Sequence, residues 1–371
     1  MYSLVRPLLF ALDPSLAHAM GLAALAPIEY VAPIRMAVRA LCARPRPRLV
    51  TRAMGLTFPS PIGLAAGFDK NARRPRALAA LGFGHIELGT VTAREQDPSP
   101  PPNLFRLPKD QALINRLGFP NDGADRVTRR LVSHGGARGV GVPVGISIGK
   151  SRVVAIDPLA PVIADYVASF RAARALADFV VVNVSSPNTK DLRALQDAAL
   201  ARELLSALVG ENARDSTGGR RVPLLVKIAP DQEEAHLVAL FAVVRELGLE
   251  GVVATNTTVS RAGLRDPETA VAAGAGGLSG PPLRARALEV VRAARRELGA
   301  GATIFGVGGV ETADDVLAFI RAGANLVQIY TGFIYGGPSI PFRLAKDLDA
   351  RLAALDVSGI ADIVGTEHQS L

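Results

Sequence analysis

The sequence predicts an α/β protein, a TIM (β/α)8 barrel preceded by a helical extension, and three observations lead to this fold class. From residue 61 onward, short runs rich in β-branched residues alternate with longer helical patterns, which is typical of βα units and a parallel sheet. Eight such runs occur, the number that closes a barrel of this kind. The chain has 371 residues, 49% of them hydrophobic, which suits one barrel with an appendage and a large buried core.

The predicted strands are nearly continuous apolar runs, as expected for parallel strands that are buried on both faces. They cover residues 62–68, 86–91, 144–148, 179–184, 224–228, 252–256, 303–307 and 326–330. Helical patterns follow most of the strands, for example at residues 161–177, 233–247, 282–298 and 312–322. Segments 48–58 and 103–114 have the pattern of small hairpins that decorate the barrel.

The first 45 residues differ from the rest and are predicted to be a separate N-terminal amphipathic helical segment, with the barrel over residues 46–371. Asp13-Pro14 marks a turn between the first two helices, and Ser15 is the expected N-cap of the second helix. The apolar stretches of this segment cover residues 4–12, 15–26 and 28–41.

The helices of this segment are too short to cross a bilayer. The longest charge-free run, residues 14–28, falls short of the ~20 residues that a transmembrane helix needs. We therefore predict a membrane-associating extension whose helices lie on the membrane surface. Two alternatives remain open: a helical cap packed on the barrel, and a signal peptide, for which only Arg6 supplies a basic n-region.

Most of the formal net charge of +8 lies in one N-terminal segment. Residues 30–68 contain no acidic residue but six arginines: Arg35, Arg39, Arg44, Arg46, Arg48 and Arg52. A basic collar beside amphipathic helices predicts an anionic membrane surface as partner, and no nucleic acid. Cys42 is the single cysteine and histidines number only 5, so no metal site is expected.

Polar and glycine residues gather after the predicted strands, where the active site of such a barrel forms. Gly308 and Gly309 follow the seventh strand, in a loop that usually binds phosphate in this fold. Lys70 and Lys227 end the first and fifth strands and call for an anionic ligand. Four asparagines offer paired donors and acceptors, which suits a planar heterocycle with carbonyl and N–H edges; they are Asn115, Asn183, Asn188 and Asn256.

Five motifs, in this order, resemble those of class 2 (quinone-dependent) dihydroorotate dehydrogenases, and the resemblance covers essentially the whole chain, including residues 1–18. The Ser-Ser-Pro-Asn-Thr motif is specific, because class 1 relatives carry Cys where class 2 enzymes carry Ser. The motifs are Ala65-Ala66-Gly67-Phe68-Asp69-Lys70, Ile114-Asn115-Arg116-Leu117-Gly118-Phe119, Asn183-Val184-Ser185-Ser186-Pro187-Asn188-Thr189, Gly277-Leu278-Ser279-Gly280 and Val307-Gly308-Gly309.

The resemblance implies site residues, with Ser186 as the catalytic base. It implies one FMN per subunit, bound by Ala66, Gly67, Phe68, Asp69, Lys70, Thr90, Ser147, Asn183, Lys227, Thr255, Ser279, Gly280, Gly308, Gly309, Tyr330 and Thr331. It implies contacts to dihydroorotate or orotate from Lys70, Asn115, Arg116, Leu117, Gly118, Phe119, Asn183, Asn188, Asn256 and Thr257.

The implied reaction is the oxidation of (S)-dihydroorotate to orotate in de novo pyrimidine (UMP) biosynthesis, with FMN as hydride acceptor and a membrane quinone as final electron acceptor. Ser186 would remove the C5 proton, held by hydrogen bonds that involve Thr189, while Lys70 neutralises the substrate carboxylate and Lys227 stabilises the reduced flavin. Residues 1–45 would form the quinone access route of a peripheral membrane protein, which in a bacterium would lie on the cytoplasmic face of the cell (inner) membrane.

The chain departs from the family pattern at several positions: the family usually has Asn at Ser147 and Ser151, often a basic residue at Asn103, and often Pro-Gly after Thr189. Three rival functions are a class 1 enzyme that uses fumarate or NAD, an RNA-modifying flavoprotein, and a non-catalytic membrane scaffold. The N-terminal helices and Ser186 argue against the first, and the localised charge and the asparagine set argue against the second. A bound flavin would exclude the third.

Overall fold

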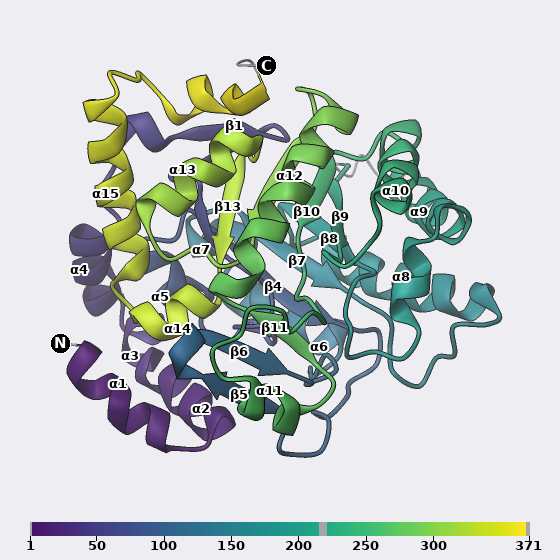
Figure 1. Cartoon of the computed structure of the whole chain (residues 1–371), viewed down its shortest axis with the longest axis horizontal. Coiled ribbons are helices and arrows are strands. Elements are labelled where there is room, and N and C mark those ends of the chain that lie inside the picture. The colour runs from purple at the N-terminus through teal and green to yellow at the C-terminus, as the bar shows by residue number, and fades with distance from the viewer. Residues whose placement is uncertain (1, 215–220, 369–371) are drawn as a thin grey trace.

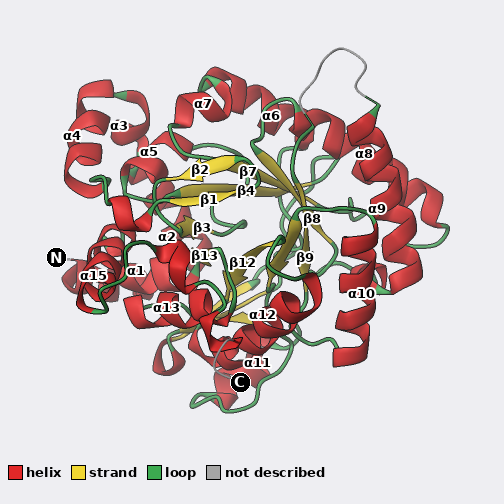
Figure 2. Cartoon of the chain, turned by 90° about the horizontal axis from the view of Figure 1, so that it is seen from above, coloured by secondary structure: helices red, strands yellow, loops and turns green. Residues whose placement is uncertain are grey.

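The computed structural model describes residues 2–214 and 221–368, so residues 1, 215–220 and 369–371 of the two predicted segments lie outside the described residues. Eight parallel strands close into a barrel in the order β10-β12-β13-β3-β4-β7-β8-β9 (Figure 2), which confirms the predicted TIM barrel. The strands are β3 (Ile62–Leu64), β4 (His85–Val91), β7 (Val144–Ile148), β8 (Phe179–Asn183), β9 (Leu224–Ile228), β10 (Gly251–Ala254), β12 (Thr303–Val307) and β13 (Leu326–Ile329).

All eight barrel strands lie where the apolar runs predicted them, and the first differs most in length. Strand β3 ends at Leu64, four residues before the predicted end. The chain nevertheless continues across the barrel, because Ala65 N–H donates to the Ile329 carbonyl at 3.1 Å and Gly67 N–H to the Gly89 carbonyl at 2.7 Å. These irregular bonds leave residues 65–67 at the mouth without a regular ladder.

Helices surround the barrel (Figures 1 and 2). They are α5 (Pro75–Ala80), α6 (Ala124–Ser133), α7 (Gly136–Val140), α8 (Leu159–Arg174), α9 (Ala198–Ala213), α10 (Glu234–Glu246), α11 (Pro267–Ala273), α12 (Arg284–Leu298), α13 (Ala313–Ala322), α14 (Thr331–Gly336) and α15 (Ile340–Ala354). The four helices predicted most clearly are α8, α10, α12 and α13. Helix α13 begins with a capping box, in which Thr312 Oγ1 accepts from Asp315 N–H and the Asp315 carboxylate accepts from Thr312 N–H.

Both predicted hairpins are present. Strands β1 (Thr51–Ala53) and β2 (Leu56–Phe58) pair antiparallel, and the buried Phe58 ring packs edge to face on His85 and Phe305. Strands β5 (Leu104–Leu107) and β6 (Ala112–Asn115) form the second hairpin. A distant strand, β11 (Gly277–Ser279), joins β6 and makes a three-stranded sheet that the sequence did not predict.

The N-terminal segment forms four helices, α1 (Tyr2–Ala11), α2 (Pro14–Ala24), α3 (Ala26–Tyr30) and α4 (Ala32–Cys42). Their outer faces are apolar: the side chains of Leu4, Leu8 and Met36 are 79%, 71% and 70% exposed. Within the described part of the chain no single helix is long and apolar enough to cross a membrane, whereas the pair Pro14–Tyr30 and Ala32–Cys42, bent by 103°, meets the criteria of length and composition together.

The predicted N-cap of α2 is wrong. Asp13, not Ser15, caps this helix, because its carboxylate accepts hydrogen bonds from the N–H groups of Ser15 and Leu16 at 2.9 and 3.0 Å. Pro14 then occupies the first helical position, which needs no N–H donor.

The inner faces of these helices do pack on the barrel, as the alternative of a helical cap required. The fully buried Glu29 of α3 accepts from Ala77 N–H of α5 at 2.8 Å and lies 3.0 Å from His134 Nδ1. At the start of α1, the Tyr2 hydroxyl donates to the Ile334 carbonyl of α14 at 2.6 Å. The segment therefore has a packed inner face and an exposed apolar outer face, a combination typical of helices that lie on a membrane.

Candidate active site

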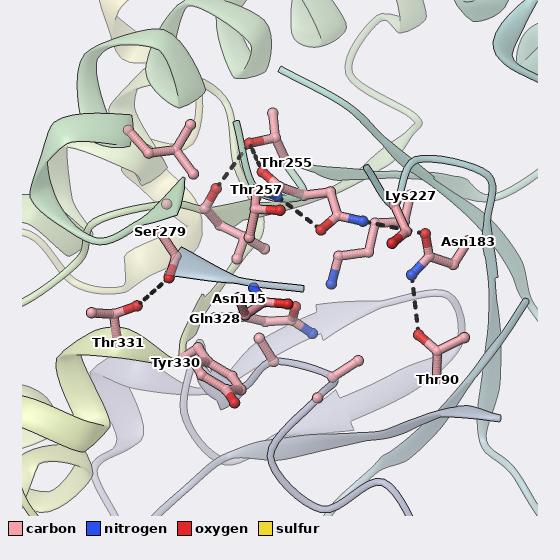
Figure 3. A pocket seen from close by; sticks show the side chains of 18 of the residues that line it. Thr90, Asn115, Asn183, Lys227, Thr255, Thr257, Ser279, Gln328, Tyr330 and Thr331 are labelled. Carbon is pink, nitrogen blue, oxygen red and sulfur yellow. Dashed lines mark hydrogen bonds between the residues drawn. The ribbon is translucent and has the colours of Figure 1, made fainter. Parts of the chain in front are cut away.

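A cavity of about 1000 Å³, its open mouth included, lies at the carboxyl ends of the barrel strands. This is the position expected of an active site in this fold, and the volume is within the range of pockets that hold cofactors and substrates. All but four of the predicted site residues line it, from Ala66, Gly67 and Lys70 after β3 to Tyr330 and Thr331 after β13. Figure 3 shows side chains from most of the strands converging on this space.

Four predicted site residues do not line the cavity. The Phe68 ring packs against Phe333 and Tyr330 behind the wall. The Asp69 carboxylate accepts from the N–H groups of Arg73 and Arg74 at 2.8 and 2.7 Å, a structural role. Arg116 turns outward, where its guanidinium lies over the Phe105 ring and donates to the Pro102 carbonyl.

Ser147, the fourth of these residues, stands behind a cavity residue. Its hydroxyl is 2.9 Å from the hydroxyl of Thr90, which in turn accepts from Asn183 Nδ2 at 3.1 Å. Where the family usually has the longer Asn, this chain therefore uses Ser147 to position Thr90. Ser151 and Asn103, the other departures, also have partners: Ser151 Oγ accepts from Arg94 N–H, and Asn103 Nδ2 donates to the Ser99 carbonyl.

One end of the cavity is a cradle of glycine backbone. Gly309 has φ +68°, and a Cβ atom there would lie 2.7 Å from the Gly280 carbonyl oxygen, so only glycine fits. Beside it, the Thr331 hydroxyl donates a hydrogen bond to the Ser279 hydroxyl at 2.8 Å (Figure 3). Closely approaching backbone and hydroxyl donors of this kind suit a phosphate, and the residues present thus fit the terminal phosphate of a mononucleotide cofactor.

The opposite end holds a buried lysine that points into the cavity (Figure 3). Lys227 Nζ lies 3.6 Å from Glu87 Oε1, and Gln328 Nε2 donates to Glu87 Oε2 at 2.8 Å. Glu87 is fully buried, so its carboxylate needs both the Lys227 ammonium and the Gln328 amide as partners. The sequence reasoning missed Glu87 and Gln328, although a glutamate inside a buried strand is itself a signal of a specific partner.

Four asparagines form two hydrogen-bonded pairs. Asn188 Nδ2 donates to Asn115 Oδ1 at 2.9 Å, and Asn256 Nδ2 donates to Asn183 Oδ1 at 3.3 Å. The backbone carbonyl of Asn183 is held by the Tyr166 hydroxyl at 2.8 Å. These bonds fix the amide groups before any ligand arrives, as recognition of a heterocycle with both donor and acceptor edges requires.

The two neighbouring serines point in different directions. Ser186 lines the cavity, is 4% exposed, and its hydroxyl accepts from Asn188 N–H at 3.2 Å. Ser185 does not line the cavity, and its hydroxyl lies in the asparagine network, donating to Asn183 Oδ1 and accepting from Asn256 Nδ2. Among the described residues the partner of the Ser186 hydroxyl is thus Asn188. From the sequence we had predicted Thr189.

Lys70 lies at the mouth with its Nζ 2.5 Å from the Gly67 carbonyl. Burial lowers the pKa of Lys70 to about 8, and the nearby Asp69 only partly opposes this shift. The ammonium form therefore dominates below that pH and is lost above it, so an anion bound by Lys70 is held best at neutral pH.

From this shift we expect kcat/KM for an anionic substrate to fall as the pH rises through about 8. The cause is loss of the Lys70 charge in the free enzyme. Steady-state rates measured across pH would show this fall in kcat/KM as a rise in KM, with kcat unchanged. We call this part of the pH profile the alkaline limb. Lys70→Arg should move the limb to higher pH, and an unchanged limb in Lys70→Met would contradict the assignment.

An aromatic wall connects the cavity with the N-terminal helices. Tyr330 lines the cavity, Phe68 packs against Tyr330, and the His18 ring of α2 packs edge to face on Phe68 with centroids 5.0 Å apart. Burial and the Lys70 charge lower the pKa of His18 to about 4, so it is neutral at physiological pH. Beside this path, Arg106 donates to the carbonyls of Phe10 and Leu12 and so fixes the end of α1.

Fold and site together define the class of protein: a TIM-barrel enzyme whose cavity presents groups suited to a phosphate at one end and to a polar heterocycle at the other. The sequence profile of the family described as "Dihydroorotate dehydrogenase" matches residues 48–352. The chain belongs to this family, whose members are flavin-dependent in general, and the predicted membership is confirmed.

Relatives and solved structures agree with this assignment. The chain is 47% identical to the "Dihydroorotate dehydrogenase (quinone)" of Thermobifida fusca (strain YX) over 361 residues, 97% of this chain and 94% of the relative. It is also 47% identical to the protein of the same name from Rhodococcus erythropolis, over 99% of both chains. The ligand-free crystal structure of DHODH from Eimeria tenella superposes with a TM-score of 0.86 at 35% identity, covering 96% of this chain and 99% of that one.

Proposed function

We propose that this protein oxidises (S)-dihydroorotate to orotate in pyrimidine biosynthesis, with FMN as hydride acceptor and a membrane quinone as final electron acceptor. The observation that carries the proposal is the convergence of Ser186, the paired asparagines and the glycine cradle on one cavity. Family membership supports the same reaction and makes the chain a quinone-type oxidoreductase.

FMN is the flavin that best fits the cradle, because the glycine backbone and the two hydroxyls offer donors for a single terminal phosphate. The proposed contacts at this end are Ser279, Gly280, Gly308, Gly309 and Thr331, and those at the ring are Ala66, Gly67, Thr90, Asn183, Lys227, Thr255 and Tyr330. Bound there, the flavin supplies a hydride acceptor for the substrate and an electron donor for the quinone.

We expect flavin released by denaturation to be FMN, one per chain. The sequence contains no adenosine-binding βαβ fingerprint, and the cradle suits one terminal phosphate. Chromatography of the released flavin, with protein measured in the same sample, would check this. FAD in the released fraction would contradict the proposal.

Dihydroorotate would lie between the flavin and the asparagine pairs. Lys70 neutralises its carboxylate, while Asn115, Asn188, Asn256 and Thr257 contact its carbonyl and N–H edges. Leu117, Gly118 and Phe119 line the remaining wall. Ser186 Oγ, buried just beyond β8, would take the proton from C5 as the hydride leaves C6, while its own hydroxyl proton passes to water. Asn188 N–H would stabilise the negative charge that develops on this oxygen.

Lys227 provides the fixed positive charge of the ring end. A preorganised cation in a dry cavity stabilises negative charge that develops during the reaction, without a reorganisation cost at that moment. Glu87 and Gln328 hold the ammonium group in place from behind. We assign Lys227 to the cofactor and Lys70 to the substrate, since Lys227 lies within β9 beside Glu87 and Lys70 lies at the mouth beyond β3.

The quinone would approach between α1 and α2. Residues 1–45 form the proposed access route, and the aromatic wall from His18 through Phe68 to Tyr330 supplies an apolar path to the cavity. The exposed Leu4, Leu8 and Met36 would lie in an anionic membrane surface, on the cytoplasmic face of the bacterial cell membrane. We propose no nucleic acid partner, because the basic collar is confined to residues 30–68.

Removal of residues 1–24 should separate the two half-reactions. The shortened chain keeps Glu29 and its contacts to α5, so the barrel cap stays in place. We expect reduction of the flavin by dihydroorotate to persist and turnover with a long-tailed quinone to collapse, with a short soluble quinone still reduced. Stopped-flow bleaching and steady-state assays measure these rates. Normal turnover with the long-tailed quinone would refute the access route.

The reaction itself is tested by the acceptor. Purified protein should form orotate from dihydroorotate with a membrane quinone and fail to do so with fumarate or NAD. Orotate formation only with fumarate or NAD would make the protein a class 1 enzyme instead. Purified protein that carries no flavin would overturn the proposal altogether.

A further inference from the structure

A second cavity, which we call the arginine cavity, lies on the flank of the barrel. It measures about 960 Å³ with its open mouth, and its lining contains no acidic residue. Helices α4, α5 and α7, which lie side by side in Figure 2, contribute to its walls together with the loops that flank them. Its six arginines are Arg35, Arg39, Arg44, Arg46, Arg76 and Arg138.

Most of this positive charge is not neutralised within the protein. Arg46 pairs with Asp349 at 3.2 Å, whereas no carboxylate of residues 2–214 and 221–368 lies within ion-pair distance of the other five. In the same described residues, Arg76 Nε is buried and has no hydrogen-bond partner. Like charges gathered around a partly enclosed space repel one another and attract anions strongly, because protein walls focus the field.

Two of these guanidinium groups are held by backbone carbonyls, and a third lies close to the backbone of Gly141. Arg35 donates to the Glu29 carbonyl at 2.7 Å, and Arg44 donates to the Ala40 carbonyl at 3.3 Å. Gly141 has φ +86°, and a Cβ atom there would lie 2.9 Å from Arg39 Nη1. Planar donors fixed by backbone contacts leave their other N–H groups for a ligand, and the guanidinium fork matches the oxygens of a phosphate.

We propose that the arginine cavity binds the phosphate of an anionic phospholipid headgroup. This inference rests on the proposed membrane association and adds a specific site to it. Met36 lines the cavity and is 70% exposed, and Leu41 on the same helix is 61% exposed. Apolar surface therefore borders the phosphate site, and the acyl chains of a lipid would lie against it. A soluble phosphate compound has no apolar part that would contact this surface.

The site supplies the second of the two signals that stable attachment requires. Apolar faces such as those of α1 and α2 alone give weak and reversible binding, and a specific electrostatic contact makes it firm. Because Arg76 and Arg138 belong to the barrel and Arg39 belongs to α4, one headgroup would join the barrel directly to the membrane.

The test is co-sedimentation of the flavin-loaded protein with vesicles of phosphatidylcholine, with or without phosphatidylglycerol. Arg39→Gln/Arg138→Gln removes two cavity charges that have no carboxylate partner among the described residues. Arg52→Gln/Arg245→Gln is the matched control, since both of its arginines are exposed and outside the cavity. We expect the cavity variant to bind phosphatidylglycerol vesicles about 30-fold more weakly, about fivefold for each arginine near the surface, and the control to change little.

Arg39→Lys/Arg138→Lys should keep most of the binding and shows that the variants fold. Equal weakening in the cavity and control variants would overturn the proposal in favour of diffuse charge, and so would binding that ignores phosphatidylglycerol. Thermal stabilisation of the parent by inorganic phosphate or a nucleotide, without competition against vesicles, would assign the cavity to a soluble anion. Flavin bleaching by dihydroorotate is measured alongside: its absence refutes the proposed function, whereas its survival with unaltered vesicle binding refutes only the lipid site.

Discussion

Ser186→Ala should slow reduction of the flavin by dihydroorotate by about 10²–10⁴-fold, the usual contribution of a general base, while orotate still binds. The change removes the proton acceptor from the cavity and leaves the volume nearly the same. Because the Ser186 hydroxyl accepts from Asn188 N–H and touches no other described group by hydrogen bond, its loss should disturb the asparagine pairs little. Anaerobic stopped-flow bleaching of the flavin measures the rate.

Two further variants locate the effect at this hydroxyl. Ser186→Cys should recover part of the rate at higher pH, since a thiolate forms more readily than an alkoxide. Ser185→Ala should be much milder, because the Ser185 hydroxyl lies outside the cavity in the asparagine network. If Ser186→Ala reduces its flavin at the parental rate, or Ser185→Ala is the slower of the two, another group is the base.

Lys227→Ala is expected to lose flavin or to slow its reduction by about 10²–10³-fold, as removal of a preorganised electrostatic donor usually does. The single variant also leaves the buried Glu87 carboxylate without its cation, which destabilises the fold. Lys227→Ala/Glu87→Gln removes that complication, because a neutral amide can remain buried beside Gln328.

The contrast with the other lysine makes this prediction specific. Lys70→Ala should mainly raise the KM for dihydroorotate, with flavin content unchanged, since Lys70 lies at the mouth of the cavity near Gly67. Flavin content by absorbance, and the KM and kcat of each variant, separate the two roles. Equal loss of flavin in Lys70→Ala and in the double variant would remove the distinction.

The barrel could be predicted because its signals are local. Apolar runs and helical patterns alternate along the chain, and each strand occurs where such a run was found. The N-cap error at Ser15 is also local in origin: Pro14 at the first helical position already indicated Asp13 as the cap. By contrast, β11 pairs with β6 across more than half of the barrel sequence, and no local pattern predicts such a partner.

The sequence predicted the site residues that lie at strand ends or within the family motifs. Parallel strands bring their carboxyl ends together, so Lys70, Asn183 and Lys227 had to meet near one mouth. Glu87 and Gln328 were missed because they lie inside buried strands: Glu87 pairs with Lys227, and Gln328 lines the cavity and donates to Glu87. Ser147 was expected to touch the cofactor, yet its short side chain reaches only Thr90.

The arginine cavity could be predicted only in part. The basic collar was evident in the sequence, and it was expected to face a membrane in general. Arg76 and Arg138 lie outside that collar, and only the packing of α5 and α7 beside α4 brings them to the same space. A cluster of this kind depends on tertiary structure, which patterns along the chain do not predict.

One anaerobic titration tests the central claim most directly. Purified protein is mixed with dihydroorotate in the absence of oxygen, its flavin spectrum is followed, and a membrane quinone is then added. The account predicts that dihydroorotate bleaches the bound flavin, that orotate appears in equal amount, and that the quinone restores the colour. A flavin that stays oxidised with saturating dihydroorotate, or a reduced flavin that the quinone cannot reoxidise, would contradict it.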